Sequence, residues 1–370
     1  MNTVRRLLYS DIVGAVVFVA TAFLALFFFI DIVDELADIG SNGYTALYAA
    51  LYCLLLVPGH LYELGPIAVL IGTIYALSRL AQSSEFTILR TSGLGPGRAL
   101  AMLALLGLAF AVLTFATGDY LAPVSEKQAA LLHGRFSGSL KFEGAGGWMK
   151  DRLMTEGGER SYSVRIGGAS AAGDLTDVRL YEFDADGRLV SRTSAAAGHV
   201  DDDATWRLRD ATVTHWRGVS ADGVPEVREE RLAAFAWHGT LSPRVISAAV
   251  LPLTTMSTFD LWRYIGHLTD NEQAAQRHRI QFWKRALYPF ACLVMVALAL
   301  PFAYLHARAG GVGLKVFGGI MLGISFVLLN NVAGHLGLLR EWTPWLVAAT
   351  PSAVYLLLSL TAFGWLVRYR

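Results

Sequence analysis

Six long runs of apolar residues dominate the hydrophobic pattern of the chain, three near its beginning and three near its end. Each is long enough, at about 18 residues or more, to cross the roughly 30 Å hydrocarbon core of a bilayer. The pattern therefore predicts an α-helical integral membrane protein with six transmembrane helices arranged as three plus three. The runs cover residues 12–30, 50–77, 99–117, 282–304, 312–336 and 344–366.

Between the two groups of runs, apolar and polar residues alternate with a period of two. The alternation extends over 146–239, in segments such as "VRLYEFD" and "TWRLRDATVTHW", with the turn signal "DADG" at 184–187. Such alternation is typical of short antiparallel strands with one buried face. We therefore expect an inserted antiparallel β-domain of the sandwich or jellyroll-like kind. After it, a helix is expected from Thr258, with a break near Asp270 and a second helix leading into the fourth run.

These patterns divide the chain into three parts. Residues 1–118 hold transmembrane helices 1–3, with a short helix at about 83–93 between the second and the third. Residues 119–281 form a region outside the membrane with the β-domain at about 140–250, and residues 282–370 hold transmembrane helices 4–6.

The distribution of Lys and Arg predicts the orientation. Both chain ends and the link between the second and third runs carry basic residues, whereas residues 31–50, on the opposite side, contain none. Basic residues in short loops mark the cytoplasmic side of a membrane protein. Both termini are therefore expected in the cytoplasm, and the β-domain outside.

Composition narrows the function classes. Hydrophobic residues make up 54% of the chain and charged residues 16%, against about 25% charged in soluble domains. The two cysteines, Cys53 and Cys292, lie in apolar runs and are expected to be buried small hydrophobes. Metal-ligand motifs and the nucleotide-binding P-loop pattern are absent from the sequence. We therefore expect no cofactor, no metal site and no nucleic-acid partner for this chain.

The segment "SSEFTILRTSGLGPGR", 83–98, lies between two predicted spans but is itself too polar to cross a membrane. Ser83 or Ser84 can cap a helix, Phe86 and Leu89 share a face three residues apart, and Gly93 can end the helix. Two interpretations stay open. The helix either docks on a cytoplasmic partner or lies on the membrane surface with its charges in water.

Several segments resemble the lipopolysaccharide-export permease family LptF/LptG, and resemble its LptG members more. The most specific is "RLAQSSEFTILRTSG", and the resemblance extends over almost the whole chain. The other matching segments are "VDELADIGSNGYTALYAALY", "LAPVSEKQA", "DLWRYIGHLTDNEQAAQRHRIQFW", "FWKRALYPFACLVMVALALPFAY" and "TPWLVAATPSAVYLLLSL". The β-domain matches in pattern more than in residues.

The resemblance implies a non-catalytic permease subunit in a bacterial inner membrane, with a periplasmic β-domain. Its implied partners are a second permease, LptF, the homodimeric ATPase LptB, which binds ATP and magnesium, and the relay proteins LptC and LptA. The complex extracts lipopolysaccharide from the membrane and passes it to a periplasmic β-jellyroll relay. The resemblance also implies that the short helix couples to the ATPase, through Glu85, Phe86, Leu89, Arg90 and Gly93.

A lipid with many acyl chains requires a wide apolar cavity. Phe27 and Phe28 near the outer end of the first run, and Leu322, Phe326 and Leu329 in the fifth, are candidate lipid contacts. Ordinary packing against lipid or neighbouring helices is the alternative for each of them.

The phosphates of such a lipid favour Lys or Arg near the outer surface. Some family members have basic residues after the first span, but here Asp31, Asp34, Glu35 and Asp38 occupy that region. Of these, Asp31 and Glu35 are candidates to hold the lipid through bridging divalent cations, or to pair with a basic partner permease. Basic candidates lie beyond the third run, where the alternative is a solvated helix face: Lys127, His133 and Arg135.

Glu63 and His60 lie within the second run, between Pro58 and Pro66. Polar groups in a span are costly and often functional. We expect the prolines to break the helix here, and an ion or proton relay is one hypothesis for the pair.

A receptor or scaffold, whose β-domain binds a partner and whose spans only anchor it, is the alternative from a different class. Six spans and an inserted cytoplasmic helix exceed what an anchor requires. A secondary transporter would show paired broken helices in inverted repeats, but only the second run carries such a break signal.

Overall fold

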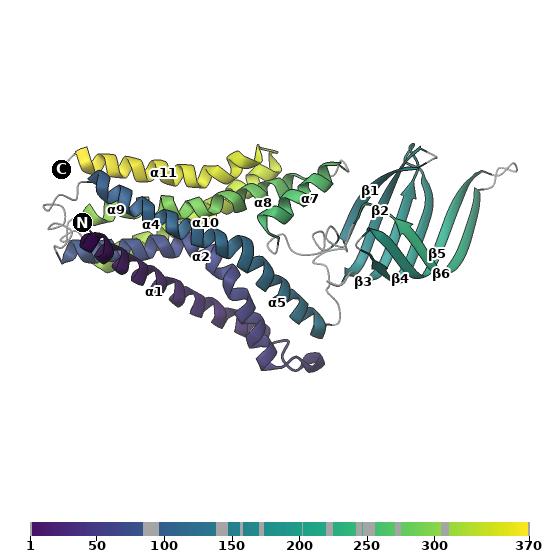
Figure 1. The fold of residues 1–370 in the computed structure, drawn as a ribbon, viewed down its shortest axis with the longest axis horizontal. Helices are drawn as coiled ribbons and strands as arrows, with labels where there is room; N and C mark the ends of the chain where they lie inside the picture. The colour runs from purple at the N-terminus through teal and green to yellow at the C-terminus, as the bar shows by residue number, and fades with distance from the viewer. Residues whose placement is uncertain are drawn as a thin grey trace. The chain divides into compact units, whose positions relative to one another are not determined.

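The computed structural model describes residues 2–83, 96–137, 147–155, 158–169, 174–201, 203–219, 225–241, 246, 256–270, 275–304 and 311–368. They form two compact units, each described by itself below (Figure 1). The first, the helical unit, comprises Met1–Ile39, Thr45–Glu126 and Gln276–Arg370. The second, the β unit, comprises Gly40–Tyr44 and Lys127–Ala275.

Six helical stretches are long and apolar enough to cross a membrane, which confirms the predicted three-plus-three arrangement. They are Arg5–Glu35, Ala46–Gln82, Gly97–Gly134, Gln276–Phe302, Val312–Leu339 and Pro344–Trp365. Four of them are the single helices α1 (Asn2–Glu35), α2 (Ala46–Gln82), α10 (Val312–Leu339) and α11 (Pro344–Arg368).

The third and fourth spans are composite. The third runs from α4 (Pro96–Ala116) through a π-helical turn (Thr117–Leu121) into α5 (Ala122–Ser137). The fourth joins α8 (Gln276–Leu287) to α9 (Ala291–Tyr304) through a single 3₁₀ turn (Tyr288–Phe290). The helix predicted from Thr258 is α7 (Thr258–Asp270), in the β unit, so the predicted interruption before α8 is also confirmed.

The expected break in the second span is wrong. Pro58 and Pro66 both lie inside α2, which continues without interruption. A proline in a helix lacks the N–H group that would bond the carbonyl four residues earlier. Neighbouring helices in a membrane protein can compensate for such lost bonds, so the prolines leave α2 continuous.

The fourth span lies at the centre of the helical unit. In its most apolar window 61% of the residues are buried, against 11% for the first span. Ala291, Cys292 and Met295 of α9 have no exposed surface. Cys53 is equally buried, so both cysteines occupy the apolar positions expected of them.

Small residues allow the helices to approach closely. A Cβ atom added to Gly72 of α2 would lie 2.6 Å from the backbone of Val16 in α1. A Cβ added to Gly323 of α10 would lie 2.9 Å from a side-chain carbon of Ile67 in α2. Close backbone approach at small residues is the usual way that membrane helices gain van der Waals contact.

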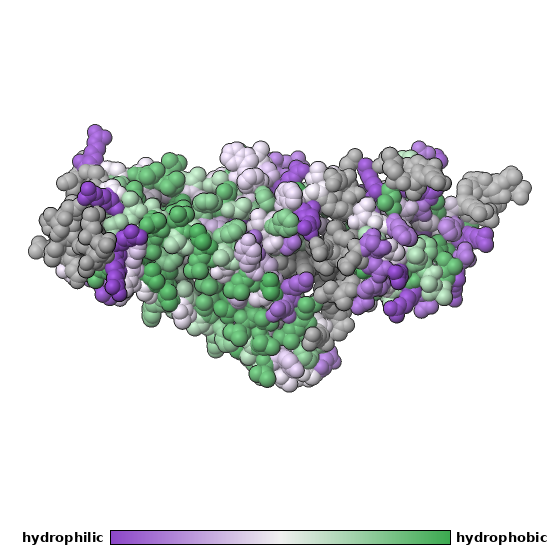
Figure 2. Space-filling view, in the orientation of Figure 1, coloured by the Kyte–Doolittle hydropathy of each residue, from purple (hydrophilic) through white to green (hydrophobic). Residues whose placement is uncertain are grey.

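Many large apolar side chains face outward from the helices, and Figure 2 shows hydrophobic residues over much of the helical surface. Phe18 of α1 is 75% exposed and Leu339 of α10 is 80% exposed. On a protein in water such a surface would be an aggregation hazard, so this surface must contact lipid or other membrane proteins.

The β unit is built on a six-stranded antiparallel sheet, which confirms the inserted β-domain. The strands pair in sequence order from β1 to β6. They are β1 (Gly147–Thr155), β2 (Gly158–Ala169), β3 (Asp174–Phe183), β4 (Leu189–Val200), β5 (Thr205–Val219) and β6 (Pro225–His238).

One face of the sheet forms an apolar core. Val164 on β2, Val178 on β3 and Leu208 on β5 are almost fully buried. Trp206 donates its indole N–H to the carbonyl of Leu241 at 3.1 Å. The carboxylate of Asp151, on the same face, is also fully buried and accepts hydrogen bonds from the Thr240 backbone N–H and hydroxyl. The two-residue alternation read from the sequence therefore separates a buried face from an opposite, more polar one.

Candidate functional site

An aspartate and a histidine join the first two spans inside the helical unit. The Nε2 atom of His60 in α2 lies 2.9 Å from Oδ2 of Asp31 in α1, and the two side chains are only 22% and 16% exposed. The ring of Phe27 lies 5.0 Å from the His60 ring, centroid to centroid. Because Phe27 and Asp31 are four residues apart, they share a helix face, and both contact the same imidazole.

Glu126 of α5 packs against α2 directly beside this pair. A Cβ atom at Gly59 would collide with its Oε1 atom, so any side chain there would force the Glu126 carboxylate to move. Its Oε2 atom is buried and has no hydrogen-bond partner among the described residues. The charges that act on the Glu126 carboxylate come from Arg285, Glu63 and His60.

Arg285 of α8 is 6% exposed and supplies the nearby positive charge. Its Nη2 atom donates a hydrogen bond of 2.6 Å to the carbonyl of Gly118, which lies in the π-helical turn. Its guanidinium group lies 5.6 Å from the centre of the Tyr62 ring. A carbonyl acceptor and an aromatic face both stabilise a buried guanidinium.

Further contacts hold this region together. The Tyr288 hydroxyl donates to the Glu63 carbonyl at 2.5 Å, and the Tyr62 and Tyr288 rings lie 5.0 Å apart. Beside Arg285, the Lys284 ammonium donates to the carbonyl of Asn330 in α10 at 2.9 Å. The side chain of Glu63 itself is exposed, so its backbone, not its carboxylate, makes this contact.

We call Asp31, His60, Glu126 and Arg285 the charged network. Its members come from the first four spans in turn. Ionisable groups in membrane-spanning segments are costly and commonly mark a transport path or a gate. The network contains two carboxylates, one imidazole and one guanidinium, a set that can hold ions or protons.

The predicted coupling residues Glu85, Phe86, Leu89, Arg90 and Gly93 lie outside the residues that the structure describes. The described helices place the segment between the end of α2 and the start of α4. Ser83 ends α2, and its hydroxyl donates to the Leu80 carbonyl at 3.3 Å. It is therefore the C-cap of α2, and its role as an N-cap of the following segment stays a prediction.

The apolar candidates take different positions. Phe27 and Phe28 are half-buried on α1. On α10, Leu322 and Leu329 pack at the edge of the helical core, while Phe326 is 1% exposed and meets the ring of Tyr355 edge-on at 5.2 Å. Phe326 thus contributes to helix packing in this structure, and contact of any of these residues with lipid stays a prediction.

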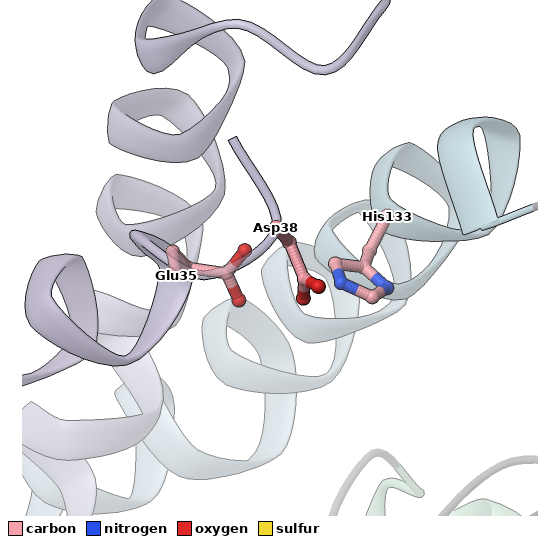
Figure 3. Close-up of side chains that lie close together, drawn as sticks. All are labelled: Glu35, Asp38 and His133. Atoms are coloured by element: carbon pink, nitrogen blue, oxygen red, sulfur yellow. The ribbon is translucent and has the colours of Figure 1, made fainter. Parts of the chain in front are cut away.

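The polar candidates at or near the outer ends of the first and third spans belong to different units, and Figure 3 labels three of them, Glu35, Asp38 and His133. Glu35 at the end of α1 and the exposed Asp38 after it belong to the helical unit. The half-buried His133 of α5 belongs to the β unit, where its ring lies 6.0 Å from that of Tyr44. Lys127 is exposed. Arg135 lies on α5, but its side chain is not among those described.

Sequence reasoning missed Arg285 and Glu126. Arg285 follows Lys284 at the edge of an apolar run. A basic pair in that position is normally interpreted as lying in water at the end of a span. Glu126 lies in the polar stretch "PVSEKQ", which was assigned to the region beyond the membrane. The usable sequence signal is a lone carboxylate at helical spacing among the small residues Ala122, Ser125 and Ala129, which the structure shows to be buried.

Six spans in two groups of three, an inserted antiparallel sheet and a charged network inside the spans define a multi-pass membrane protein of the transporter class. The model of the family "Lipopolysaccharide export system permease LptF/LptG" matches residues 6–366. The chain therefore belongs to the LptF/LptG family of lipopolysaccharide export permeases.

Individual relatives agree with this assignment. The chain is 28% identical over 334 residues to the lipopolysaccharide export system permease protein LptG of Escherichia coli strain K12, covering 90% of this chain and 89% of that protein. It is 26% identical over 364 residues to the LptG protein of Haemophilus influenzae, covering 97% of both. Because each match covers nearly all of this chain and nearly all of the relative, the similarity is not confined to one part of the chain.

Proposed function

We propose that this chain is the LptG-type permease subunit of a transporter that extracts lipopolysaccharide from the inner membrane and passes it to a periplasmic relay. The observation that carries the proposal is the family match over residues 6–366, which includes all six spans and the inserted sheet. The anchor-only receptor is not favoured, because an anchor has no use for a charged network spread over four spans.

The arrangement of the spans supports a cytoplasmic coupling segment. An even number of spans puts both ends of the chain on one side, and α1 begins where α11 ends in the helical unit (Figure 1). The link between the second and third spans then lies on that same side. Arg5, Arg6, Arg79 and Arg368 make it the cytoplasmic side, and the β unit, inserted after the third span, is periplasmic.

The outward-facing apolar surface supports an assembly with a second permease. Exposed side chains on α1 and α10, including Phe18 and Leu339, would pack against LptF and line a cavity for acyl chains. ATP and magnesium belong to the homodimeric ATPase LptB, which would contact Glu85 to Gly93. The periplasmic relay partners would be LptC and LptA.

The experiment that tests the proposal is a tagged pull-down of the full chain from solubilised membranes, with the ATPase activity of the eluate measured with and without lipopolysaccharide. We expect a second six-span protein and an ATPase to co-purify, and the lipid to change the hydrolysis rate. Recovery of the chain alone, without ATPase activity, would contradict the proposal.

Glu85→Ala tests the coupling segment in the same assay, with Ser83→Ala as the control because Ser83 is the C-cap of α2. We expect Glu85→Ala to reduce the amount of ATPase recovered, or to remove the response of its activity to lipid. Equal recovery and an equal response in both variants would remove Glu85 from the coupling site.

A further inference from the structure

The face of the β-sheet opposite its apolar core carries five basic side chains on four neighbouring strands. We call it the basic face and define it by Lys150, Arg152, Arg165, Arg179 and Arg192. The register sets these residues side by side, since Lys150 is paired with Ser163, Arg152 with Ser161 and Arg165 with Arg179. Figure 2 shows hydrophilic residues over the strands of this unit.

Two arginines of the basic face oppose each other across a strand pair. Arg165 of β2 is the direct register partner of Arg179 of β3, and Arg192 of β4 is the partner of Tyr181, two residues along from Arg179. Like charges at directly opposite positions of an antiparallel pair destabilise the sheet. Three adjacent guanidinium groups are therefore a local cost to the fold, which a bound anion would remove.

The three arginines at the centre of the face differ in their hydrogen bonds. The Nε atom of Arg179 donates to Asp177 at 3.2 Å, at one end of the face. The Nε atoms of Arg165 and Arg192 are buried and have no hydrogen-bond partner among the described residues. A guanidinium group presents several N–H donors in a planar fork, and this fork matches the oxygens of a phosphate.

A cavity of ≈ 240 Å³ opens on the same face. Its lining combines the two cations of β1, two hydroxyl groups and an aromatic ring: Lys150, Arg152, Ser161, Ser163, Phe183 and Gly187. Cations beside hydroxyl donors suit a phosphate ester. Next to the cavity, the rings of Trp148 and Tyr181 stack at 5.8 Å and 26°, and such aromatic faces pack against the apolar face of a sugar ring.

We propose that the basic face binds phosphorylated sugars, with the phosphate held by Arg165, Arg192 and the cations of the cavity, and the sugar ring packed on Trp148 and Tyr181. This inference rests on the proposed function, because the lipid of that transporter carries such groups on its sugars. It adds a periplasmic site for the sugar part of the substrate, on the outside of the sheet and separate from its apolar core.

The test measures binding to the full chain in nanodiscs of zwitterionic lipid, so that no ATPase or second permease is needed. The probes are lipopolysaccharide, the same lipopolysaccharide after enzymatic dephosphorylation, glucosamine 6-phosphate and inorganic phosphate. The variant Arg165→Gln/Arg192→Gln replaces each guanidinium with a neutral amide that can still donate hydrogen bonds, and so removes two charges. The control variant Arg209→Gln/Arg228→Gln removes two exposed arginines of β5 and β6, outside the basic face.

We expect the basic-face variant to bind phosphorylated lipopolysaccharide about tenfold more weakly, as follows from losing charge-assisted hydrogen bonds. The control is expected to bind within about twofold of the unaltered chain. Competition by glucosamine 6-phosphate, but not by equal inorganic phosphate, would assign the site to sugar phosphates; equal competition by both would assign it to phosphate alone and remove the sugar contact.

Equal binding of the dephosphorylated lipid, or an unchanged affinity in the basic-face variant, would overturn the proposal. So would equal binding to vesicles of phosphatidylglycerol, because the face would then recognise an anionic membrane surface. If Arg165→Gln/Arg192→Gln lowers the unfolding temperature by more than a few degrees, Lys150→Gln/Arg152→Gln on the edge strand β1 replaces it. A result against the sugar-phosphate site would not affect co-purification of the chain with the ATPase. The two proposals can therefore be contradicted independently.

Discussion

The Nη2 atom of Arg285 donates a hydrogen bond to the carbonyl of Gly118 at 2.6 Å, and so connects the fourth span to the π-helical turn of the third. A π-helical turn disturbs the regular helical bonding, which leaves carbonyls available to other donors. The buried guanidinium and the irregular turn therefore depend on each other.

Arg285→Ala is expected to destabilise the helical unit by about 2–3 kcal/mol, because it removes a charged hydrogen bond and leaves the Gly118 carbonyl buried without that donor. Thermal unfolding in detergent would measure the change. Arg277→Ala, at an exposed arginine about two turns earlier on α8, is the control and should leave the unfolding temperature within about a degree. Equal unfolding temperatures for both variants would contradict a structural role for Arg285.

Glu126→Gln separates function from stability in the charged network. The carboxylate has a buried oxygen with no hydrogen-bond partner among the described residues, so its charge contributes little to folding. We expect the glutamine variant to unfold at the same temperature or higher, while lipid-dependent ATPase activity of the assembled complex falls severalfold. Retention of full lipid-dependent activity would show that the charge of Glu126 has no part in transport.

Gly72→Leu tests the close packing of the first two spans. Even a single Cβ atom at this position would lie 2.6 Å from the Val16 backbone, so a larger side chain must separate α1 from α2. Overpacking of this kind costs about 1–3 kcal/mol. Gly364→Leu on α11 is the matched control, because a Cβ there meets nothing within 4 Å. Disulfide crosslinking between cysteines placed on α1 and α2 should fall only in the Gly72 variant.

The β unit is expected to lose stability at alkaline pH through Tyr162. Burial, and then the nearby Glu182 carboxylate, raise the pKa of its hydroxyl above the ordinary value of 10.0. Folding thus favours the protonated phenol, and this contribution to stability is complete below pH 10 and is lost as the pH rises through the folded pKa. Tyr162→Phe should weaken the fall in unfolding temperature between pH 9 and 11, whereas Tyr181→Phe, on the other face, should not.

Lys127→Glu together with Arg135→Glu should reduce photo-crosslinking of lipopolysaccharide near the outer end of the third span, since two cations become anions that repel its phosphates. The control Arg209→Glu/Arg228→Glu introduces the same charges on β5 and β6. Crosslinking that is equal in the two double variants would remove Lys127 and Arg135 from the lipid site.

The spans and the β-domain could be predicted because their signals are local. Apolar length identifies a span without knowledge of its neighbours, and a two-residue period identifies a half-buried strand. The break expected at Pro58 and Pro66 was wrong because neighbouring helices can satisfy a proline-containing helix, and a single sequence does not contain that information.

Side chains that meet only through tertiary structure could not be found in this way. Asp31 and His60 were both singled out, but nothing in the spacing of α1 and α2 indicates that they pair. The basic face is harder still to predict from the sequence. Its five cations are scattered over four strands, and only the strand register brings them next to one another. Arg165 and Arg179 are fourteen positions apart in the sequence and direct neighbours in the sheet.

The π-helical turn at Thr117–Leu121 means that the third span cannot be treated as one regular helix. A turn of this type contains one residue more than an α-helical turn, and each residue advances a helix by about 100°. A helical wheel drawn from α4 straight through to α5 would therefore misplace every later side chain by that angle. Glu126 would be drawn on the wrong side, away from α2. Deletion of one residue within the turn, which would restore a regular α-helix, should therefore leave its carboxylate beside Gly59, whereas deletion of one residue from α5 between the turn and Glu126 should rotate it away.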